Sequence, residues 1–178
     1  MQVRNKKVFQ LTLGGVCLAL TIVFMSAASI APAMKLTLYA VSSLFIAMMI
    51  IEAGPKGGWA LYAAAVLLGL LLVPNKLGIL PYACLFGLYG IVKYYIEKLR
   101  TPVGQVVLKL VFFGAMVSLA LLLFKGLFLG GIHLPGYPTA ALIAGGVIFM
   151  MVYDVLYTLV INLYLKRFKK VKEIKLGQ

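Results

Sequence analysis

Long apolar runs, separated by short stretches rich in turn residues, constrain this chain more than any other sequence feature. Each run has, or nearly has, the roughly 20 residues that a helix needs to cross the hydrocarbon core of a bilayer. None alternates polar and apolar residues as the strands of a membrane barrel do. The sequence therefore predicts an all-α membrane protein, a bundle of six transmembrane helices. These helices are expected at residues 8–31, 36–53, 57–73, 78–96, 104–129 and 139–165.

Composition agrees with a single membrane domain. The 178 residues are 63% hydrophobic and only 12% charged, whereas soluble domains are about half apolar and about a quarter charged. We therefore expect one integral membrane domain over residues 1–178, with a basic tail at 166–178. The third run is short, and a partly re-entrant stretch at 73–81 is the alternative. The first run is longer than the apolar part of a signal peptide, so we interpret it as a membrane helix.

The distribution of lysine and arginine predicts the orientation of the helices, because cytoplasmic loops carry an excess of both. Both termini are basic, so both are expected in the cytoplasm, which requires an even number of spans. With six spans, only three lysines fall outside: Lys35, Lys76 and Lys125. The cytoplasmic set is Arg4, Lys6, Lys7, Lys56, Lys93, Lys98, Arg100, Lys166, Arg167, Lys169, Lys170, Lys172 and Lys175.

The formal net charge of +13 follows from the same residues. Since they flank apolar runs and form no basic groove, we expect contact with anionic lipid at the cytoplasmic face and no binding of nucleic acid. The tail can be read as a solvated topology anchor or as an amphipathic helix on the lipid surface.

Residues suited to catalysis or metal binding are few. Cys17 and Cys84 lie inside apolar runs, and His133 is the sole histidine. No metal-ligand spacing, nucleophile motif, phosphate-binding loop or paired carboxylate is present. We therefore expect neither an enzyme nor a bound metal or cofactor.

A set of polar and aromatic residues falls on the outer side of the predicted bundle, in or near the three outer connections. Three cations with nearby amide and aromatic groups would suit a small anionic or aromatic ligand. The alternative is that the lysines only end helices and contact lipid phosphates. The candidate ligand-binding residues are Lys35, Tyr39, Asn75, Lys76, Tyr82, Lys125, His133 and Tyr137.

Asp154 is the one acidic residue within an apolar run. It precedes Lys166 by 12 residues, or roughly 18 Å along a helix, which places it near the midplane of the bilayer. An unpaired carboxylate is costly there, so it should face the interior of the bundle. It can pair with Lys109 or Lys93, accept hydrogen bonds from hydroxyls such as those of Tyr153 and Tyr157, or be protonated. A structural node, a proton or cation relay, and substrate contact all remain open.

Small residues mark one face of the first predicted helix, where Gly15 and Ala19 lie one turn apart. Such residues allow two membrane helices to approach closely. They could serve packing within the bundle or docking of a partner protein.

In size, six helices, cytoplasmic ends, an alanine- and glycine-rich first helix and outer loops that could close over a ligand, the chain resembles the substrate-binding S components of energy-coupling factor (ECF) vitamin transporters. The resemblance implies capture of a vitamin or its precursor from outside a prokaryotic cell membrane. It also implies docking on a shared module of one transmembrane subunit and two ATPases. Gly15 and Ala19 would lie on the docking face, although the family usually has alanine at both positions.

Two other functions remain as alternatives. The chain resembles less closely the small cell-shape membrane protein of rod-morphogenesis complexes, which acts as a scaffold through helix contacts. A proton- or sodium-coupled carrier using Asp154 is the third hypothesis, although such carriers usually contain an internal repeat and none is evident in this sequence.

Overall fold

The computed structural model describes residues 2–74, 76, 79–128 and 139–176, with side chains placed for 6–31, 33–74, 76, 79–119, 140–141 and 143–167. Every regular element in these ranges is helical, and five helices are long and apolar enough to cross a membrane. The long helices are α1 (Gln2–Ile30), α2 (Lys35–Leu72), α5 (Pro102–Phe128) and α6 (Thr139–Leu176). The fifth is a continuous run of α3 (Ile79–Pro81), a π-helical turn (Tyr82–Gly87) and α4 (Leu88–Glu97). A 3-10 turn (Pro32–Met34) joins α1 to α2.

Helix α2 bends sharply at Gly54, where φ is 78° and ψ is −179°. Only glycine adopts this backbone region without strain, because it lacks a Cβ atom. Pro55 follows, and its ring disfavours the helical conformation of the residue before it. The expected helices at 36–53 and 57–73 are therefore the two arms of α2, which is why five long helices are found where six were expected.

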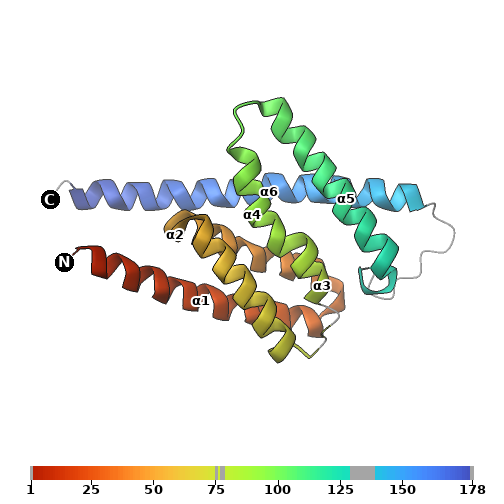
Figure 1. Cartoon of the computed structure of the whole chain (residues 1–178), viewed down its shortest axis with the longest axis horizontal. Helices are drawn as coiled ribbons and strands as arrows, with labels where there is room; N and C mark the ends of the chain where they lie inside the picture. The colour runs from red at the N-terminus through yellow and green to blue at the C-terminus, as the bar shows by residue number, and fades with distance from the viewer. Residues whose placement is uncertain (1, 75, 77–78, 129–138, 177–178) are drawn as a thin grey trace.

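Contacts with α1 give the directions of the two arms. The Gln10 side-chain amide in α1 donates to the carbonyl oxygen of Glu52 at 2.7 Å, so the end of the first arm lies beside the start of α1. Toward the other end of α1, the Met25 methyl group lies 2.8 Å from the place that a Cβ on Gly69 would take. The first arm thus runs antiparallel to α1, and the second turns back parallel to it (Figure 1).

The π-helical turn lies where the second arm of α2 approaches the α3–α4 run. The Tyr62 hydroxyl donates to the carbonyl oxygen of Ala83 at 2.9 Å, and so satisfies an acceptor within the widened turn. A Cβ on Gly87 would lie 3.0 Å from the Tyr62 ring, so the glycine permits this approach. The run was expected to be an ordinary helix at 78–96, since the wide turn leaves no mark in the apolar pattern.

Helix α6 also differs from expectation in length. The sequence predicts a membrane span over 139–165 followed by a tail that is either a solvated anchor or an amphipathic helix, and the structure has one helix that continues through these residues to Leu176. Lysine, arginine and glutamate are good helix formers, and no glycine or proline interrupts the chain before Gly177.

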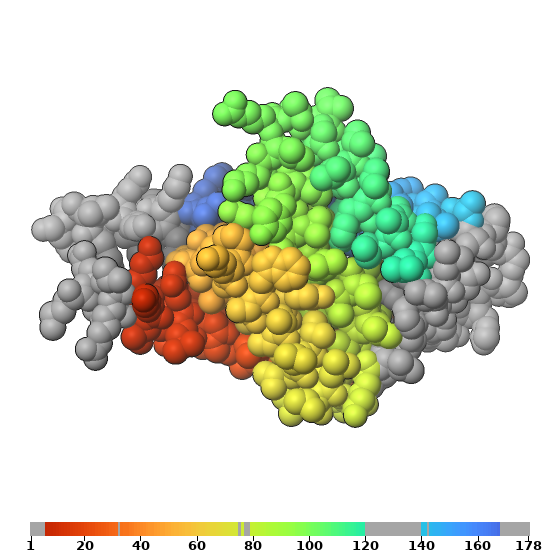
Figure 2. Space-filling view, in the orientation of Figure 1, coloured from red at the N-terminus to blue at the C-terminus, as the bar shows by residue number. Residues whose placement is uncertain are grey.

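Aromatic rings form the centre of the fold. The Tyr89 ring on α4 lies 5.0 Å from that of Phe113 on α5 and 5.8 Å from that of Tyr157 on α6. A Cβ on Gly90 would lie 2.5 Å from the Tyr157 hydroxyl, so α4 and α6 meet where α4 has no side chain. Helices α1, α2, α4 and α5 form the face drawn in Figure 2, with α6 behind them. The largest fully buried rings are Tyr39, Tyr82, Tyr89, Tyr157, Phe86 and Phe113.

The bend in α2 can be tested with Gly54→Ala. A Cβ on Gly54 meets no atom within 4 Å, so the cost of the substitution is backbone strain alone, about 1–3 kcal/mol. We expect a lower midpoint of thermal unfolding in detergent. Gly114→Ala is the control, because a Cβ there also meets nothing within 4 Å and alanine favours the helix. Equal midpoints for the two variants would contradict the bend.

Candidate functional site

Four charged side chains form a closed ring between α4, α5 and α6. The ammonium group of Lys93 pairs with Asp154 and lies 2.7 Å from Oε1 of Glu97. The ammonium group of Lys109 lies 2.8 Å from Oδ2 of Asp154 and 3.5 Å from Oε1 of Glu97. Asp154 therefore contacts both of the lysines that the sequence offered as partners. With two charges of each sign, the ring is formally neutral.

The ring is buried on one side and reaches solvent on the other. The exposed fraction of the side chain is 2% for Lys93, 11% for Lys109 and 13% for Asp154, but 40% for Glu97. Burying a charge in low dielectric is costly, and removing a partner leaves that cost uncompensated. Each of the three buried charges has two partners of opposite sign. Lys93 and Lys109 both pair with Asp154 and with Glu97, so Asp154 is paired with two lysines.

Helical spacing brings these groups together. Tyr89, Lys93 and Glu97 follow one another at intervals of four and share one face of α4. The Tyr89 hydroxyl donates to the carboxylate of Asp154. On α6, the Thr158 hydroxyl accepts from Lys93 at 2.8 Å and donates to the backbone carbonyl of Asp154 at 2.8 Å. A polar face of α4 thus meets a polar face of α6 at the charged ring.

Gln105 positions the third helix. Its side-chain amide donates to the carbonyl oxygen of Leu99 at 2.8 Å, just beyond the end of α4. Carbonyl groups at the end of a helix have no partner within the helix. The bond therefore gives the Leu99 carbonyl oxygen a donor, and it also holds α5 against the end of α4. Lys109 follows Gln105 by one turn and therefore reaches the ring.

The hydroxyl that contacts Asp154 differs from those suggested by the sequence. Tyr153 and Tyr157 were the candidates, but both bond to Ser43 in α2, Tyr153 through the Ser43 hydroxyl and Tyr157 through the carbonyl oxygen at 3.1 Å. The contact is made instead by Tyr89. Its position one turn before the first lysine of the ring is the signal that could have identified it.

The arrangement suits a neutral cross-link rather than a reactive centre. Asp154 accepts from three donors on two helices, so both of its carboxylate oxygens are occupied. Within the residues that the structure describes, no group of three or more His, Cys, Asp or Glu side chains could hold a metal ion. Two cavities border the ring, a groove of about 430 Å³ that starts at Asp154 and a cavity of about 110 Å³ beside Lys93 and Glu97.

Of the expected outer residues, the structure brings Tyr39 and Tyr82 together, with ring centroids 6.3 Å apart and both side chains fully buried. In the described part of the chain, the Tyr82 hydroxyl has no hydrogen-bond partner. Lys35 is half-buried at the start of α2, and Lys76 is exposed. Outside the described residues lie Asn75, His133 and Tyr137, together with the side chain of Lys125.

The two small residues expected to dock a partner lie on the outside of α1. Both Gly15 and Ala19 are exposed, and a Cβ on Gly15 would meet no atom within 4 Å. This face of α1 is thus not used for packing against the residues that the structure describes.

No protein-family model matches the chain, and neither the curated proteins nor the solved structures contain a match.

The ring can be tested through stability. Asp154→Asn leaves two buried lysines with one partly exposed carboxylate, and we expect a loss of about 3–5 kcal/mol in unfolding free energy. Adding Lys109→Met removes one charge of each sign and should restore part of this loss, with a coupling of about 1–3 kcal/mol. Chemical unfolding in mixed micelles measures both.

Lys98→Gln is the control for loss of a charge at an exposed position, with an expected change within about 0.5 kcal/mol. A double variant no more stable than Asp154→Asn alone would show that the ring does not stabilise the fold.

Proposed function

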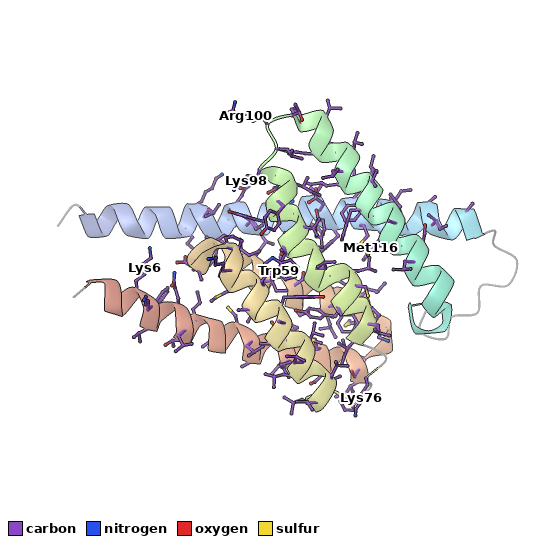
Figure 3. The ribbon with its side chains drawn as sticks, in the orientation of Figure 1. Lys6, Trp59, Lys76, Lys98, Arg100 and Met116 are labelled. Carbon is purple, nitrogen blue, oxygen red and sulfur yellow. The ribbon has the colours of Figure 1, made fainter. Side chains whose placement is uncertain are left out.

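We propose that this chain is the substrate-binding subunit of an uptake transporter, which captures a vitamin or related micronutrient from the outer side and docks on a separate energising module. In this proposal the two arms of α2 are separate spans, so six spans leave both ends in the cytoplasm. The alternating directions of α1 and the two arms support it. Lys6 and Lys76 lie at opposite ends of the α1–α2 unit, as this topology requires (Figure 3).

The observation that carries the proposal is the buried hydroxyl of Tyr82. A buried polar group without a partner costs about 1–3 kcal/mol, and a bound ligand with an acceptor would remove that cost. The centroid of the Tyr39 ring lies 6.3 Å from that of Tyr82 and 6.4 Å from that of Phe86, so Tyr82 belongs to a group of aromatic rings that could contact an aromatic ligand. Tyr82 is also the first residue of the π-helical turn, and such turns are frequent at functional sites.

The charged ring supports different roles for two parts of the bundle, the part that contains Asp154 and the part that contains Tyr82. A coupled carrier would need Asp154 to exchange a proton or a cation during transport. Here two lysines and Tyr89 hold its carboxylate, which favours a structural role. In this proposal the ligand binds beside Tyr39 and Tyr82, and the charged ring holds α4, α5 and α6 together.

Ligand capture can be tested by mass spectrometry of the small molecules released when gently purified protein is denatured. We expect one water-soluble metabolite at near-stoichiometric amount, directly or after incubation with a vitamin mixture. Tyr82→Phe removes only the unpartnered hydroxyl and should weaken binding about tenfold, the factor for one hydrogen bond of roughly 1.4 kcal/mol. Tyr95→Phe, at a half-exposed ring, should have no effect.

The neutral variant Asp154→Asn/Lys109→Met separates this proposal from a coupled carrier, because it should retain ligand binding. Recovery of lipid and detergent only, after incubation with vitamins, would contradict ligand capture and favour a scaffold. Loss of binding in the neutral variant, with the fold intact by circular dichroism, would favour the carrier.

Docking can be tested with Gly15→Leu/Ala19→Leu, which adds bulk on an exposed face of α1 and should leave the bundle folded. We expect co-purification with a co-expressed ECF module to be lost. The matched control is Ala60→Leu/Ala63→Leu, which adds six side-chain carbons in place of seven at two exposed alanines of the second arm of α2. Equal recovery of the module with both double variants would contradict docking through α1.

A further inference from the structure

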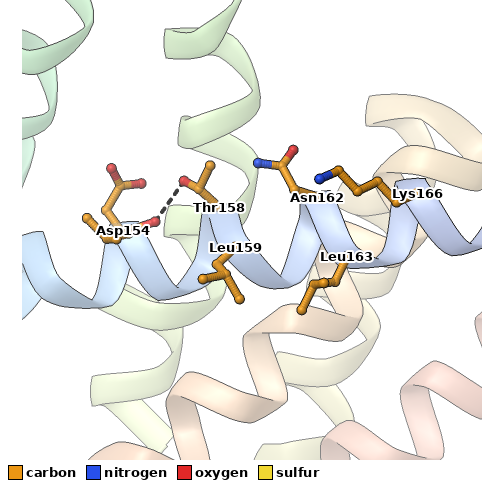
Figure 4. A pocket seen from close by; sticks show the side chains of 7 residues that line it. Asp154, Thr158, Leu159, Asn162, Leu163 and Lys166 are labelled. Atoms are coloured by element: carbon orange, nitrogen blue, oxygen red, sulfur yellow. Dashed lines mark hydrogen bonds between the residues drawn. The ribbon is translucent and has the colours of Figure 1, made fainter.

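A row of polar side chains runs along α6 beside a row of apolar ones. The polar residues are spaced four apart along α6, so they share one face of the helix. An open groove of about 430 Å³ follows both rows. In Figure 4 the polar row lies along one edge of the helix, with Leu159 and Leu163 next to it. The polar row is Asp154, Thr158, Asn162 and Lys166, and the apolar row is Val155, Leu159 and Leu163.

The charged ring accounts for only half of the polar row. Asp154 and Thr158 bond to side chains of α4 and α5. Asn162 and Lys166 follow Thr158 on the same row, one and two turns farther along α6. Asn162 and Lys166 are both exposed, and no partner for either is found among the described side chains. The Lys166 side chain lies back along the helix toward Asn162 (Figure 4).

This free end of the groove favours an anion. Lys166 supplies a positive charge and Asn162 an amide donor, a pair that can bond to phosphate oxygens. The only acidic group in the groove, Asp154, lies eight residues before Asn162, or about 12 Å away along the helix. Asp154 is also paired with Lys109 and Lys93. An anion beside Lys166 would therefore not face an uncompensated negative charge.

The apolar row favours an amphiphile over a free anion. Val155, Leu159 and Leu163 are 65%, 51% and 59% exposed, and they extend from the free end of the groove toward the middle of α6. In a helix that crosses the membrane this row lies at the depth of the acyl chains, so a lipid held by its headgroup at Lys166 would pack one chain along the row through van der Waals contacts. A free phosphate or a soluble metabolite would contact the polar row alone.

We propose that the groove on α6 binds an anionic phospholipid, with the headgroup phosphate on Lys166 and Asn162 and one acyl chain along Val155, Leu159 and Leu163. The site requires only that α6 crosses the membrane with Lys166 near a headgroup layer, and it is independent of the proposed ligand capture. It is a specific lipid site on one helix, distinct from the diffuse attraction of a basic surface.

Native mass spectrometry of the full chain, titrated with phosphatidylglycerol or with phosphatidylcholine of the same acyl chains, tests the site. We expect one phosphatidylglycerol to bind more tightly than the rest and more tightly than phosphatidylcholine. Lys166→Gln should weaken this first binding about fivefold, the effect of one basic residue near an anionic lipid. Asn162→Leu should weaken it without any change in charge.

Lys56→Gln is the matched control, since it removes an exposed lysine beside the bend of α2, outside the groove. It should leave the first binding unchanged. Equal binding of the two lipids, or equal losses with Lys166→Gln and Lys56→Gln, would overturn the site. In that case the row would be a surface for a helix of another protein. Circular dichroism of each variant verifies that the fold is intact.

Discussion

A carboxylate within a helix that is long and apolar enough to cross a membrane must be compensated, and the arrangement of α4, α5 and α6 depends on how this chain compensates Asp154. The carboxylate accepts from Lys93, Lys109 and Tyr89, which come from the two helices packed against α6. Each lysine is also paired with Glu97, so removing any member of the ring leaves another charge with one partner fewer in a low-dielectric interior. The ring thereby fixes both the contacts and the relative register of three helices.

Aromatic side chains form one connected cluster within a core that is otherwise mostly aliphatic. At one end of the cluster, Tyr89 donates through its hydroxyl to the carboxylate of the charged ring and packs its aromatic ring against those of Phe113 and Tyr157. At the other end of the cluster, Tyr39 packs against Tyr82, the first residue of the π-helical turn, whose hydroxyl has no hydrogen-bond partner among the described residues. The charges at the first end of the cluster all have partners, whereas the Tyr82 hydroxyl at the second end has none among the described residues, and this difference is the physical basis for our proposal that the second end binds a ligand.

The sequence predicts the parts of this structure that depend on local chemistry. Apolar length predicts helices that can cross a membrane, and Gly54 with Pro55 predicts a break within what is otherwise a continuous helix. Pairing of Asp154 with lysine follows from the cost of a buried charge. Tyr89 and Glu97 were missed because their roles depend on which face of α4 meets α6, and that is set by packing. The turn at Tyr82–Gly87 was missed because it depends on Tyr62, twenty residues earlier.

Asp154 is ionised and paired within the bundle in this account, and infrared spectroscopy of its carboxyl group tests that state. Asp154 is the sole aspartate in the sequence, so cell-free synthesis with aspartate that carries ¹³C only at its side-chain carboxyl carbon places the label on this carboxyl group alone. At neutral pH in lipid we expect the band of a carboxylate, shifted in Lys109→Met, where one of its donors is lost. The band of a protonated carboxyl group, or one that is insensitive to Lys109→Met, would contradict the ring.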